Sequence, residues 1–251
     1  MNLSSKDKKI LIFSDPHQEI DKVEYIINKE NADIILCLGD WFDSFRANKK
    51  EDIIKTCNFL KKWINKPNFF SLNANHDLSQ LYTNYYTKCS GYTEENNKII
   101  RENLGEYLEV IKNKLLWYVW VDDWFCSHAG INWRLFPYNL EINKEAISNW
   151  LDREIEAAKV CLESGQDHWL YAAGRGRGGA REVGGITWQD WDREFEPVEG
   201  ISSLQGHSFH KTIVPPNGFI TSNPLEANDL CIDCNLKEWI MIENGKTEIR
   251  S

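Results

Sequence analysis

Residues of the types that bind divalent metal ions stand in three short motifs in the first third of the chain. The motifs are DPH at residues 15–17, GDWFD at 39–43 and NHD at 75–77. Each follows an apolar run of the length expected for a buried strand. Carboxylate and imidazole groups in combination suit a borderline ion such as Mn, Fe or Zn better than Mg or Ca. The three motifs therefore indicate a site for a borderline divalent ion.

Two more motifs of this kind occur later in the chain. SHAG stands at residues 127–130 and GHS at 206–208, so that four of the 6 histidines lie in the five motifs. Together the motifs offer more ligands than one ion needs, which indicates a pair of ions bridged by a carboxylate. Two ions about 3.5–4 Å apart can clamp a phosphate and lower the pKa of a bridging water, which makes a hydroxide nucleophile.

Each motif taken alone has an ordinary structural explanation. An aspartate at the end of a strand often caps a helix or a turn. A single histidine such as His128 is often a structural residue that is hydrogen-bonded in the core. Five strand-end motifs in this order are poorly explained as five unrelated caps, so we predict a metal centre.

The elements that must position these residues follow from the hydrophobic periodicity. Apolar runs at 9–14, 33–39 and 68–72 predict buried strands, and apolar residues spaced by three and four predict helices over 19–31 and 50–65. Strands that alternate with helices indicate βαβ units with parallel neighbours. The carboxyl ends of parallel strands lie at one edge of a sheet, where such folds bind their ligands. We therefore expect the first three motifs to converge.

The middle of the chain is predicted to be helical, and the chain is predicted to end in antiparallel strands. Helical spacing covers 94–113 and 143–163, and hairpin turns are expected at 122–123 and 244–245. The short strands expected in the last quarter lie at 202–206, 218–222, 229–234, 238–243 and 246–250. Two sheets that pack together with helices outside would accommodate this α/β (α+β) pattern.

The composition excludes several classes of protein. The 251 residues fit one domain, which we predict to span 1–251. The formal charge of −9 disfavours long nucleic acids as partners. We find no apolar run of the length of a membrane span and no signal peptide, so we expect no membrane partner and a cytoplasmic location. The 7 scattered cysteines do not indicate a disulfide framework.

In this order, DPH, GDWFD, NHD, SHAG and GHS resemble the motifs of the calcineurin-like metallophosphoesterase superfamily. The usual pattern there is D-x-H, G-D-x-x-D, G-N-H-[DE], a later His and G-H. The segments SHAGI, GGITWQDW, GHSF and CIDC are most similar to the branch of protein Ser/Thr phosphatases and bacterial diadenosine tetraphosphate hydrolases. The resemblance covers nearly the whole chain. It implies a four-layer sandwich of two mixed β-sheets flanked by helices.

The resemblance also implies a role for each matching residue. The implied metal ligands are Asp15, His17 and Asp40 for one ion, and Asp40, Asn75, His128 and His207 for the other. His76 would be the general acid, and Asp43 would orient it. Asn75 would also reach the substrate phosphate. The expected cofactor is a pair of divalent ions, with Mn as the first expectation and Fe, Zn or Ni as alternatives.

The chain departs from the family pattern at several positions. Ala74 replaces the usual glycine, so the backbone there must avoid a positive φ or bear strain. The phosphatase branch has an arginine where Ser44 stands, and the nearest arginine, Arg46, becomes a candidate to bind substrate. His210 is one step away from a further family histidine. We therefore expect His210 and His168 not to be ligands.

The segment 174–185, GRGRGGAREVGG, has three arginines among its glycines. It lacks the helix of a dinucleotide-binding fingerprint and the G-K-[ST] of a P-loop. One interpretation is a loop that brings guanidinium groups to a phosphate, with Arg177 as the first candidate and Arg175 as the second. The alternative is a solvated surface loop whose glycines serve turns.

The predicted function is a phosphatase in which a hydroxide bridging two metal ions attacks a phosphate ester in line. The substrate expected first is a phosphomonoester such as a phosphoprotein. A dinucleoside polyphosphate hydrolase and a phosphodiesterase acting on nucleic-acid ends or 2′,3′-cyclic phosphates are alternatives. A non-catalytic protein-binding member of the fold would be expected to have lost ligands, and none is missing. The sequence leaves the oligomeric state open.

Overall fold

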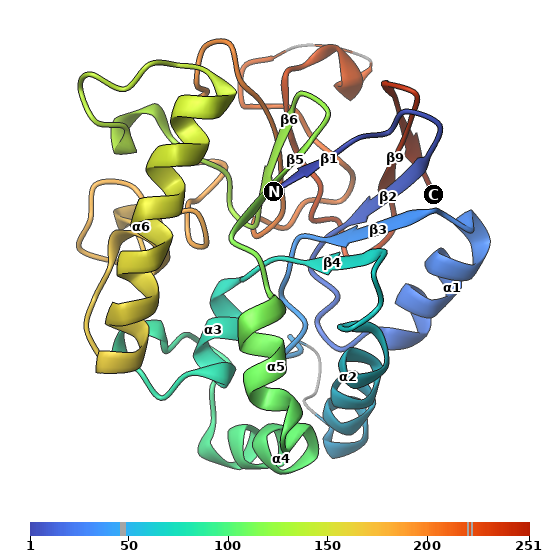
Figure 1. The fold of residues 1–251 in the computed structure, drawn as a ribbon, viewed down its shortest axis with the longest axis vertical. Helices are drawn as coiled ribbons and strands as arrows, with labels where there is room; N and C mark the ends of the chain where they lie inside the picture. Colours follow the sequence, from blue (N-terminus) through green and yellow to red (C-terminus); the bar gives the residue numbers. More distant parts are fainter. Residues whose placement is uncertain (46–48, 220, 222) are drawn as a thin grey trace.

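The computed structural model describes residues 1–45, 49–219, 221 and 223–251, which form two five-stranded sheets with helices outside them (Figure 1). The first sheet has the order β10-β9-β2-β3-β4, and the second has the order β1-β5-β6-β7-β8. The strands are β1 (Asn2–Leu3), β2 (Lys9–Phe13), β3 (Ile34–Cys37), β4 (Phe69–Ser71), β5 (Tyr118–Val121), β6 (Trp124–Ser127), β7 (Ser202–Gln205), β8 (Asp229–Cys231), β9 (Trp239–Glu243) and β10 (Lys246–Arg250). Both sheets mix parallel and antiparallel pairs.

The helices come mostly from the first two thirds of the chain. The α-helices are α1 (Ile20–Glu30), α2 (Lys50–Trp63), α3 (Asn75–Leu81), α4 (Glu94–Leu104), α5 (Tyr107–Lys114) and α6 (Lys144–Ser164). Short 3₁₀ helices cover Tyr85–Thr87, Trp133–Leu135, Trp169–Tyr171, Arg175–Arg177 and Pro224–Glu226. In the described part of the chain, no helix combines the length and the apolar character needed to cross a membrane.

The alternation of side chains along β2 shows why the first sheet is covered on both faces. Leu11 and Phe13 pack in one apolar cluster with Val23 of α1, whereas Ile10 and Ile12 pack in a second cluster between the sheets. Successive side chains of a strand point to opposite faces, so an apolar strand needs a partner on each. The first sheet is therefore buried between helices and the second sheet.

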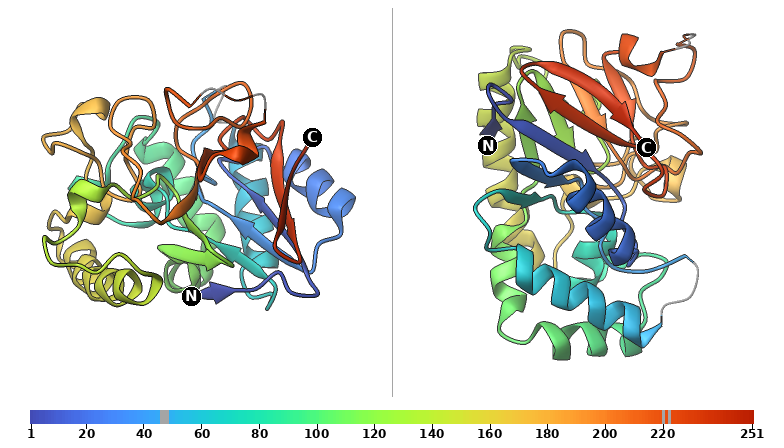
Figure 2. Two further views of the ribbon diagram at one scale, coloured as in Figure 1. Left: turned by 90° about the horizontal axis from the view of Figure 1, so that it is seen from above. Right: turned by 90° about the vertical axis from the view of Figure 1, so that its right-hand side faces the viewer.

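The second sheet is built in the same way, with α6 on its outer face. Val119 of β5 lies in the cluster between the sheets. Its neighbours turn to α6, where Tyr118 Oη donates to Asp152 at 2.8 Å and Trp120 Nε1 donates to Ser148 Oγ at 3.0 Å. Figure 2 shows the resulting layers, with α1 beyond the first sheet and α6 beyond the second. The predicted four-layer sandwich of two mixed sheets is confirmed.

The parallel βαβ units are confirmed, but the expectation of a wholly antiparallel end is wrong. β2, β3 and β4 are parallel neighbours, and the hairpins at 122–123 and 244–245 are present. In the second sheet, however, β7 is parallel to both β6 and β8. The physical reason is the long crossover between β6 and β7, which contains α6 and returns the chain to the same end of the sheet.

Two predicted elements differ in detail. The helical segment 94–113 is divided into α4 and α5 at Gly105, whose φ of +54° ends the first helix. In the predicted strand at 218–222, the described residues 218, 219 and 221 lie outside any strand. Two prolines precede them, and Phe219 N donates to Pro216 O at 3.1 Å as part of a turn. Local turn formation therefore outweighs the strand propensity of that segment.

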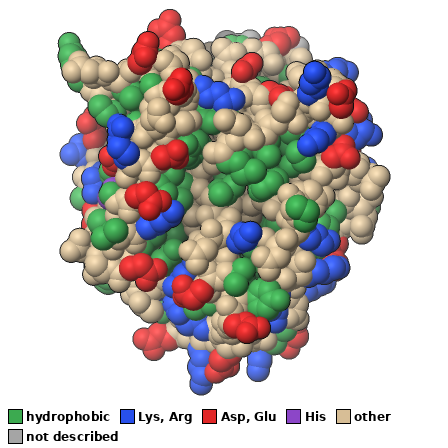
Figure 3. Space-filling model, in the orientation of Figure 1, with side chains coloured by type: hydrophobic (Ala, Val, Ile, Leu, Met, Phe, Trp, Pro, Cys, Tyr) green, Lys and Arg blue, Asp and Glu red, His purple; other side chains and the backbone are tan. Residues whose placement is uncertain are grey.

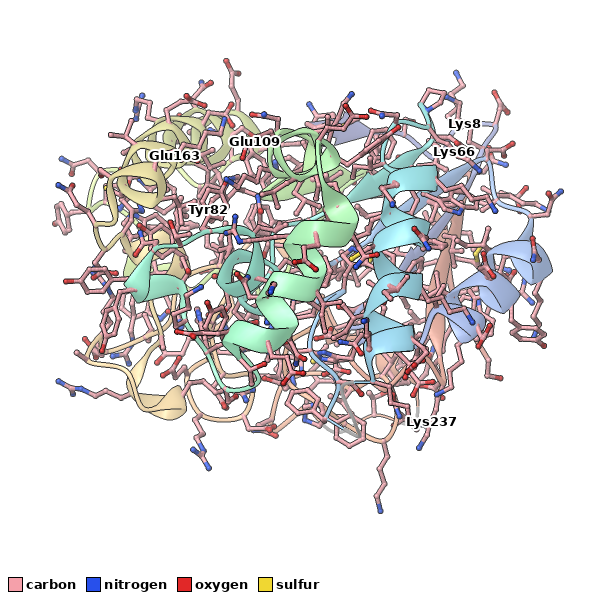
Figure 4. The ribbon with its side chains drawn as sticks, turned by 90° about the horizontal axis from the view of Figure 1, so that it is seen from below. Lys8, Lys66, Tyr82, Glu109, Glu163 and Lys237 are labelled. Carbon is pink, nitrogen blue, oxygen red and sulfur yellow. The ribbon has the colours of Figure 1, made fainter. Side chains whose placement is uncertain are left out.

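Helix α3 begins directly after the third strand end and was not predicted. Ala74 precedes it with an extended backbone, φ −129°, so the alanine meets the requirement to avoid a positive φ. Tyr82 follows α3 and lies close to Glu109 of α5 and Glu163 of α6 (Figure 4). Burial, with a further effect of the two carboxylates, raises the pKa of Tyr82. Tyr82 is therefore a buried, neutral phenol at the C-terminal end of α3.

Candidate metal centre

The first two motifs are joined by their backbones at the carboxyl ends of β2 and β3. Asp15 N donates to Gly39 O at 3.1 Å, and His17 N donates to Asp40 O at 2.9 Å. Gly39 has φ +101°, and a Cβ there would lie 2.5 Å from the Cβ of Ala74. Only glycine fits this position, which brings the three strand ends of the first sheet against one another.

The second sheet meets the first at the same place. Gly206 N donates to His128 O at 2.7 Å, which pairs the ends of the parallel strands β6 and β7. A Cβ on Gly206 would lie 2.1 Å from Asp15 Oδ2, so the absence of a side chain allows the close approach. His207 N then donates to the carboxylate of Asp15 at 3.1 Å. The five sequence motifs therefore form one cluster.

The side chains of this cluster form two groups that share one aspartate. In each group the candidate ligand atoms lie within 4.8 Å of one another. The groups are Asp15, His17 and Asp40 on one side and Asp40, His128 and His207 on the other. Asn75 Oδ1 joins the second group, at 3.0 Å from His128 Nε2 and 3.1 Å from His207 Nδ1. This is the arrangement that two ions bridged by Asp40 would require.

Backbone carbonyls fix the rings of two of these histidines. His17 Nδ1 lies 2.7 Å from Asp43 O, and His128 Nδ1 lies 2.9 Å from Leu38 O. A carbonyl only accepts, so in each ring Nδ1 is the donor and Nε2 is the nitrogen left to face an ion. Both Nε2 atoms face Asp40 Oδ2, at 3.7 Å from His17 and 3.5 Å from His128. Both rings are therefore oriented as metal ligands.

His207 supplies a direct test of whether the cluster fits metal ions. Its Nε2 is buried and has no hydrogen-bond partner among the described residues. Burial, followed by the neighbouring His128 and Arg177, lowers the pKa of His207 well below its usual value, so the ring is neutral. Nδ1 is the nitrogen of this neutral ring that points at Asn75 Oδ1 in the second ligand group, and a neutral imidazole can offer a lone pair to an ion. The residues present therefore fit a divalent centre.

The two buried aspartates support the same conclusion. Burial raises the pKa of Asp15 to about 6, although His128 opposes the effect. Burial also opposes the ionisation of Asp40, but His128, His76 and His17 together outweigh it and hold the pKa of Asp40 below its usual value. Buried carboxylates need compensating positive charge. Divalent ions between these side chains would supply it.

His76 and Asp43 form a hydrogen-bonded pair beside the cluster. His76 Nδ1 lies 3.0 Å from Asp43 Oδ2, and Gln80 Nε2 donates to the other carboxylate oxygen at 2.7 Å. Burial works against protonation of His76, but Asp40 and the bond to Asp43 raise its pKa well above the usual value. Because Nδ1 is held by Asp43, Nε2 is the nitrogen that can give a proton to a ligand.

The sequence analysis gave no role to three residues of the site. The carboxylate of Asp77 accepts from Asp40 N and Trp41 N, both at 2.9 Å, and so shapes the loop that carries Asp40. Gln80 stands four residues after His76, a spacing that places both on one face of a helix and could have indicated their proximity. Cys89 Sγ lies 3.4 Å from His76 Nδ1. Cys89 lies in a loop, and no motif in the sequence indicated that it would lie near His76.

The backbone is strained at the residues predicted to act. Residues other than glycine seldom adopt positive φ, although Asp and His do so more readily than most. Such conformations concentrate at functional sites because the surrounding structure holds them in place. The predicted site residues with positive φ are Asp15 (54°), His17 (41°), Asp40 (65°), Asp43 (62°) and His207 (69°).

The glycine-rich segment brings one of its arginines to the cluster. Arg177 Nε pairs with Asp190 Oδ2 at 2.7 Å, and its Nη2 donates to Ser208 Oγ at 2.8 Å, next to His207. Arg175 is exposed, and its described hydrogen bonds use only its backbone. The structure therefore brings Arg177 to the site and leaves Arg175 outside it. Arg46 lies outside the described residues.

The other two histidines lie apart from the cluster. His210 contacts Ser208 O and Asp192 through its two ring nitrogens. His168 accepts from Leu170 N at the start of a 3₁₀ helix. Neither belongs to a group of possible metal ligands found among the described residues. The roles assigned to the individual site residues remain predictions.

Known proteins share both the sequence pattern and the fold. The sequence model of the calcineurin-like phosphoesterase family matches residues 8–208. A cold-active protein-tyrosine phosphatase from a psychrophilic Shewanella species has a similar structure, with 14% identity, a TM-score of 0.64 and coverage of 99% of this chain and 78% of that one. A protein serine/threonine phosphatase from Saccharomyces cerevisiae has 12% identity, a TM-score of 0.52 and coverage of 100% and 82%. No curated protein sequence matches the chain significantly. At these identities the structural likeness concerns the fold.

Proposed function

Since the chain belongs to the calcineurin-like phosphoesterase family, whose members use a divalent dimetal centre, we propose that it is a phosphatase acting on phosphomonoesters such as a phosphoprotein. The observation that supports this most is the pair of ligand groups sharing Asp40, with the His76–Asp43 pair beside them. Water attacks phosphorus in line, and the ester oxygen leaves on the opposite side.

The ligand assignment follows the two groups. Asp15, His17 and Asp40 would hold one ion, and Asp40 with the three residues Asn75, His128 and His207 would hold the other. Such ions supply a water of lowered pKa and positive charge for the phosphate oxygens. Manganese is our first expectation, with Fe, Zn or Ni as alternatives, because the donors mix carboxylate, amide and imidazole.

The chain's own residues complete the reaction. His76 is protonated at neutral pH and gives the Nε2 proton to the leaving oxygen, while Asp43 holds the ring. The described contacts of Arg177 use Nε and Nη2, so we assign its Nη1 donors to a phosphate oxygen. Asn75 Oδ1 faces the ion site, which leaves the amide nitrogen for the phosphate.

The distribution of charge favours a compact phosphorylated substrate over a long nucleic acid. Acidic and basic side chains are interspersed on the face seen in Figure 3, and neither sign forms a continuous stripe there. A nucleic-acid groove requires clustered positive charge. We also propose that residues 1–251 act as one catalytic domain, since Leu3 and Ile242 pack in the same core between the sheets.

The test is hydrolysis of a small substrate panel by the Mn²⁺-loaded protein, with Asp40→Asn as the control. The panel holds p-nitrophenyl phosphate, its bis ester, a phosphopeptide, diadenosine tetraphosphate and a 2′,3′-cyclic nucleotide. We expect monoester turnover that disappears in the control. Turnover that persists in Asp40→Asn would contradict the site, and a preference for the diester or the tetraphosphate would contradict the monoester assignment.

A further inference from the structure

An apolar pocket opens directly beside the proposed first ion site. Its volume is about 360 Å³, and its walls include the ligands Asp15 and His17 and the rings of Phe45 and Phe209. The exposed fractions of these two phenylalanines are 73% and 61%. Single exposed aromatic residues are common, but two that share one pocket beside a proposed catalytic site form an apolar patch of the kind that marks a binding site. The pocket therefore has the properties of a binding site for an apolar group.

The position of Phe45 connects this pocket to the reacting atoms. Its ring centroid lies 4.7 Å from that of His17 and 5.6 Å from that of His76, both in edge-to-face geometry. His76 gives its proton to the leaving oxygen in the proposed reaction. A group bonded to that oxygen would thus extend toward Phe45. The pocket lies where the leaving group of the substrate must go.

A second pocket on the other side of the cluster has a different character. It is about 440 Å³ in volume and includes Lys88, Arg177 and Trp188. Its two cations suit phosphate oxygens or an acidic segment. The described lining of the first pocket instead contains Glu19 and Asp233 and no lysine or arginine. The second pocket therefore suits the charged part of a substrate better than the first pocket does.

We propose that the Phe45–Phe209 pocket binds the aromatic ring of an aryl phosphate monoester, with phosphotyrosine of a protein as the natural substrate. This inference rests on the proposed phosphatase function. A tyrosine ring is neutral, flat and apolar, and it can stack against two phenylalanines. The side chain of phosphoserine is too short to cover either ring.

The reaction on such a substrate balances without a further reactant. Water oxygen forms a bond to phosphorus, and the bond between phosphorus and the phenolic oxygen breaks. The phenolic oxygen takes the electron pair of that bond together with a proton from His76. The products are inorganic phosphate and the unmodified tyrosine, and His76 regains its proton from the attacking water.

The experiment compares two peptides that differ only in carrying phosphotyrosine or phosphoserine. Values of kcat/KM are measured for the Mn²⁺-loaded wild type, Phe45→Ala and Phe209→Ala. The leaving-group chemistry of the peptides is the same for every variant, so only the change in their ratio reports on the pocket. We expect each alanine to lower the phosphotyrosine to phosphoserine ratio about three- to tenfold. Turnover of the phosphoserine peptide also shows that each variant is folded.

Tyr138→Ala is the matched control, because Tyr138 is a fully exposed aromatic residue on another surface. It should leave the ratio unchanged. Phe209→Leu, which keeps apolar area without a ring, should lower the ratio less than Phe209→Ala does. Equal losses on both peptides in the alanine variants, or an unchanged ratio, would overturn the proposal.

A binding measurement separates this proposal from the function on which it rests. Calorimetry compares phenylphosphonate with methylphosphonate, neither of which can be hydrolysed. The wild type should prefer the phenyl compound, and the two alanine variants should lose most of that preference. An inactive wild type that still shows this pattern would refute the phosphatase proposal and keep the pocket. An active wild type that does not prefer the phenyl compound would support the phosphatase proposal and refute the pocket.

Discussion

The two sheets contribute to the proposed metal centre in unequal ways. The first sheet supplies Asp15, His17, Asp40 and Asn75 from three adjacent strand ends, and their loops are hydrogen-bonded to one another. The second sheet supplies two histidines, His128 and His207, at the ends of β6 and β7. These histidines take their orientation from the first sheet, through Leu38 O, the carboxylate of Asp15 and Asn75 Oδ1.

This difference indicates a hierarchy within the site. The candidate ligands of the first sheet are held by hydrogen bonds within that sheet's own loops. The two histidines of the second sheet are held by hydrogen bonds to the first sheet. Changes in the first sheet should therefore disturb both ion sites, and changes in the second should disturb one. The predictions below test this order, beginning with the largest expected effect.

Asp40→Asn should remove both ions and nearly all activity, because Asp40 belongs to both ligand groups. His207→Asn is the matched change in the second sheet, and it should lose the second ion while the first is retained. Elemental analysis of the bound metal, together with turnover, measures both effects. Equal metal loss in the two variants would remove the distinction between the sheets.

His76→Ala should keep both ions and lose activity in a way that depends on the substrate. General acid catalysis contributes about 10²–10⁴-fold when the leaving group is a poor one. The loss should therefore be large for an alkyl phosphate and much smaller for p-nitrophenyl phosphate, whose leaving group needs little protonation. Kinetics on both substrates provide the measurement. Metal retention with the same loss on both would count against the acid role.

Asp77→Asn should weaken the first-sheet edge without removing a ligand. One carboxylate oxygen becomes an NH₂ group that faces a backbone donor, Asp40 N or Trp41 N. An unsatisfied buried donor costs about 1–3 kcal/mol. We expect a fall in the free energy of unfolding of that order and weaker binding of both ions. Denaturant unfolding and metal titration test this, and unchanged metal affinity would show that the loop does not depend on Asp77.

Arg177→Ala should raise KM about ten- to a hundredfold with a smaller change in metal content, as expected for the loss of a charged hydrogen bond of about 1.5–3 kcal/mol. Arg175→Ala is the matched control from the same segment, and it should behave like the wild type because Arg175 lies outside the site. Steady-state kinetics of the two variants decide between them. A raised KM in Arg175→Ala and a normal KM in Arg177→Ala would show that Arg175, not Arg177, binds the phosphate.

Asp229→Asn should give the smallest effect, and only on stability. Burial raises the pKa of Asp229 on β8 to about 6, although Ser203 donates to its carboxylate. The pKa of aspartate in an unfolded chain is about 3.9. The contribution of Asp229 to stability is therefore present below that pH and is lost as the pH rises through about 6. Asparagine does not ionise, so the variant does not lose stability as the pH rises. The variant should be more stable than the wild type by about 1–3 kcal/mol at pH 8, with a much smaller gain at pH 4.

Urea unfolding at the two pH values measures this effect. A variant that gains the same stability at both would show that ionisation of Asp229 is not the cause. Because Asp229 lies in the second sheet, away from the ligands, the variant should also keep its metal ions and its activity. Loss of activity would show that the second sheet is coupled more tightly to the site than its contacts indicate.

The sequence pointed to the candidate ligands because most of them stand at the end of an apolar run. A run such as 9–14 predicts a buried strand by its composition alone, and a polar residue that follows it must lie at the strand end. The family resemblance then gave each residue a proposed role. Glycines 39 and 206 were also in place, although their need for close approach became clear only from the packing.

Other features depend on residues that are distant in the chain, and only the tertiary structure decides them. Asp77 and Gln80 form hydrogen bonds to the loop of residues 40–43, which is distant in the sequence. Likewise, the pattern of a strand does not encode the direction in which it pairs with a distant strand. The sequence therefore indicated which residues could bind metal and where most of the strands would end. The packing of the two sheets decided the distances between the candidate ligands, the neutral state of the His207 ring and the pocket of Phe45 and Phe209. Burial and hydrogen bonds between distant segments exist only in the folded chain.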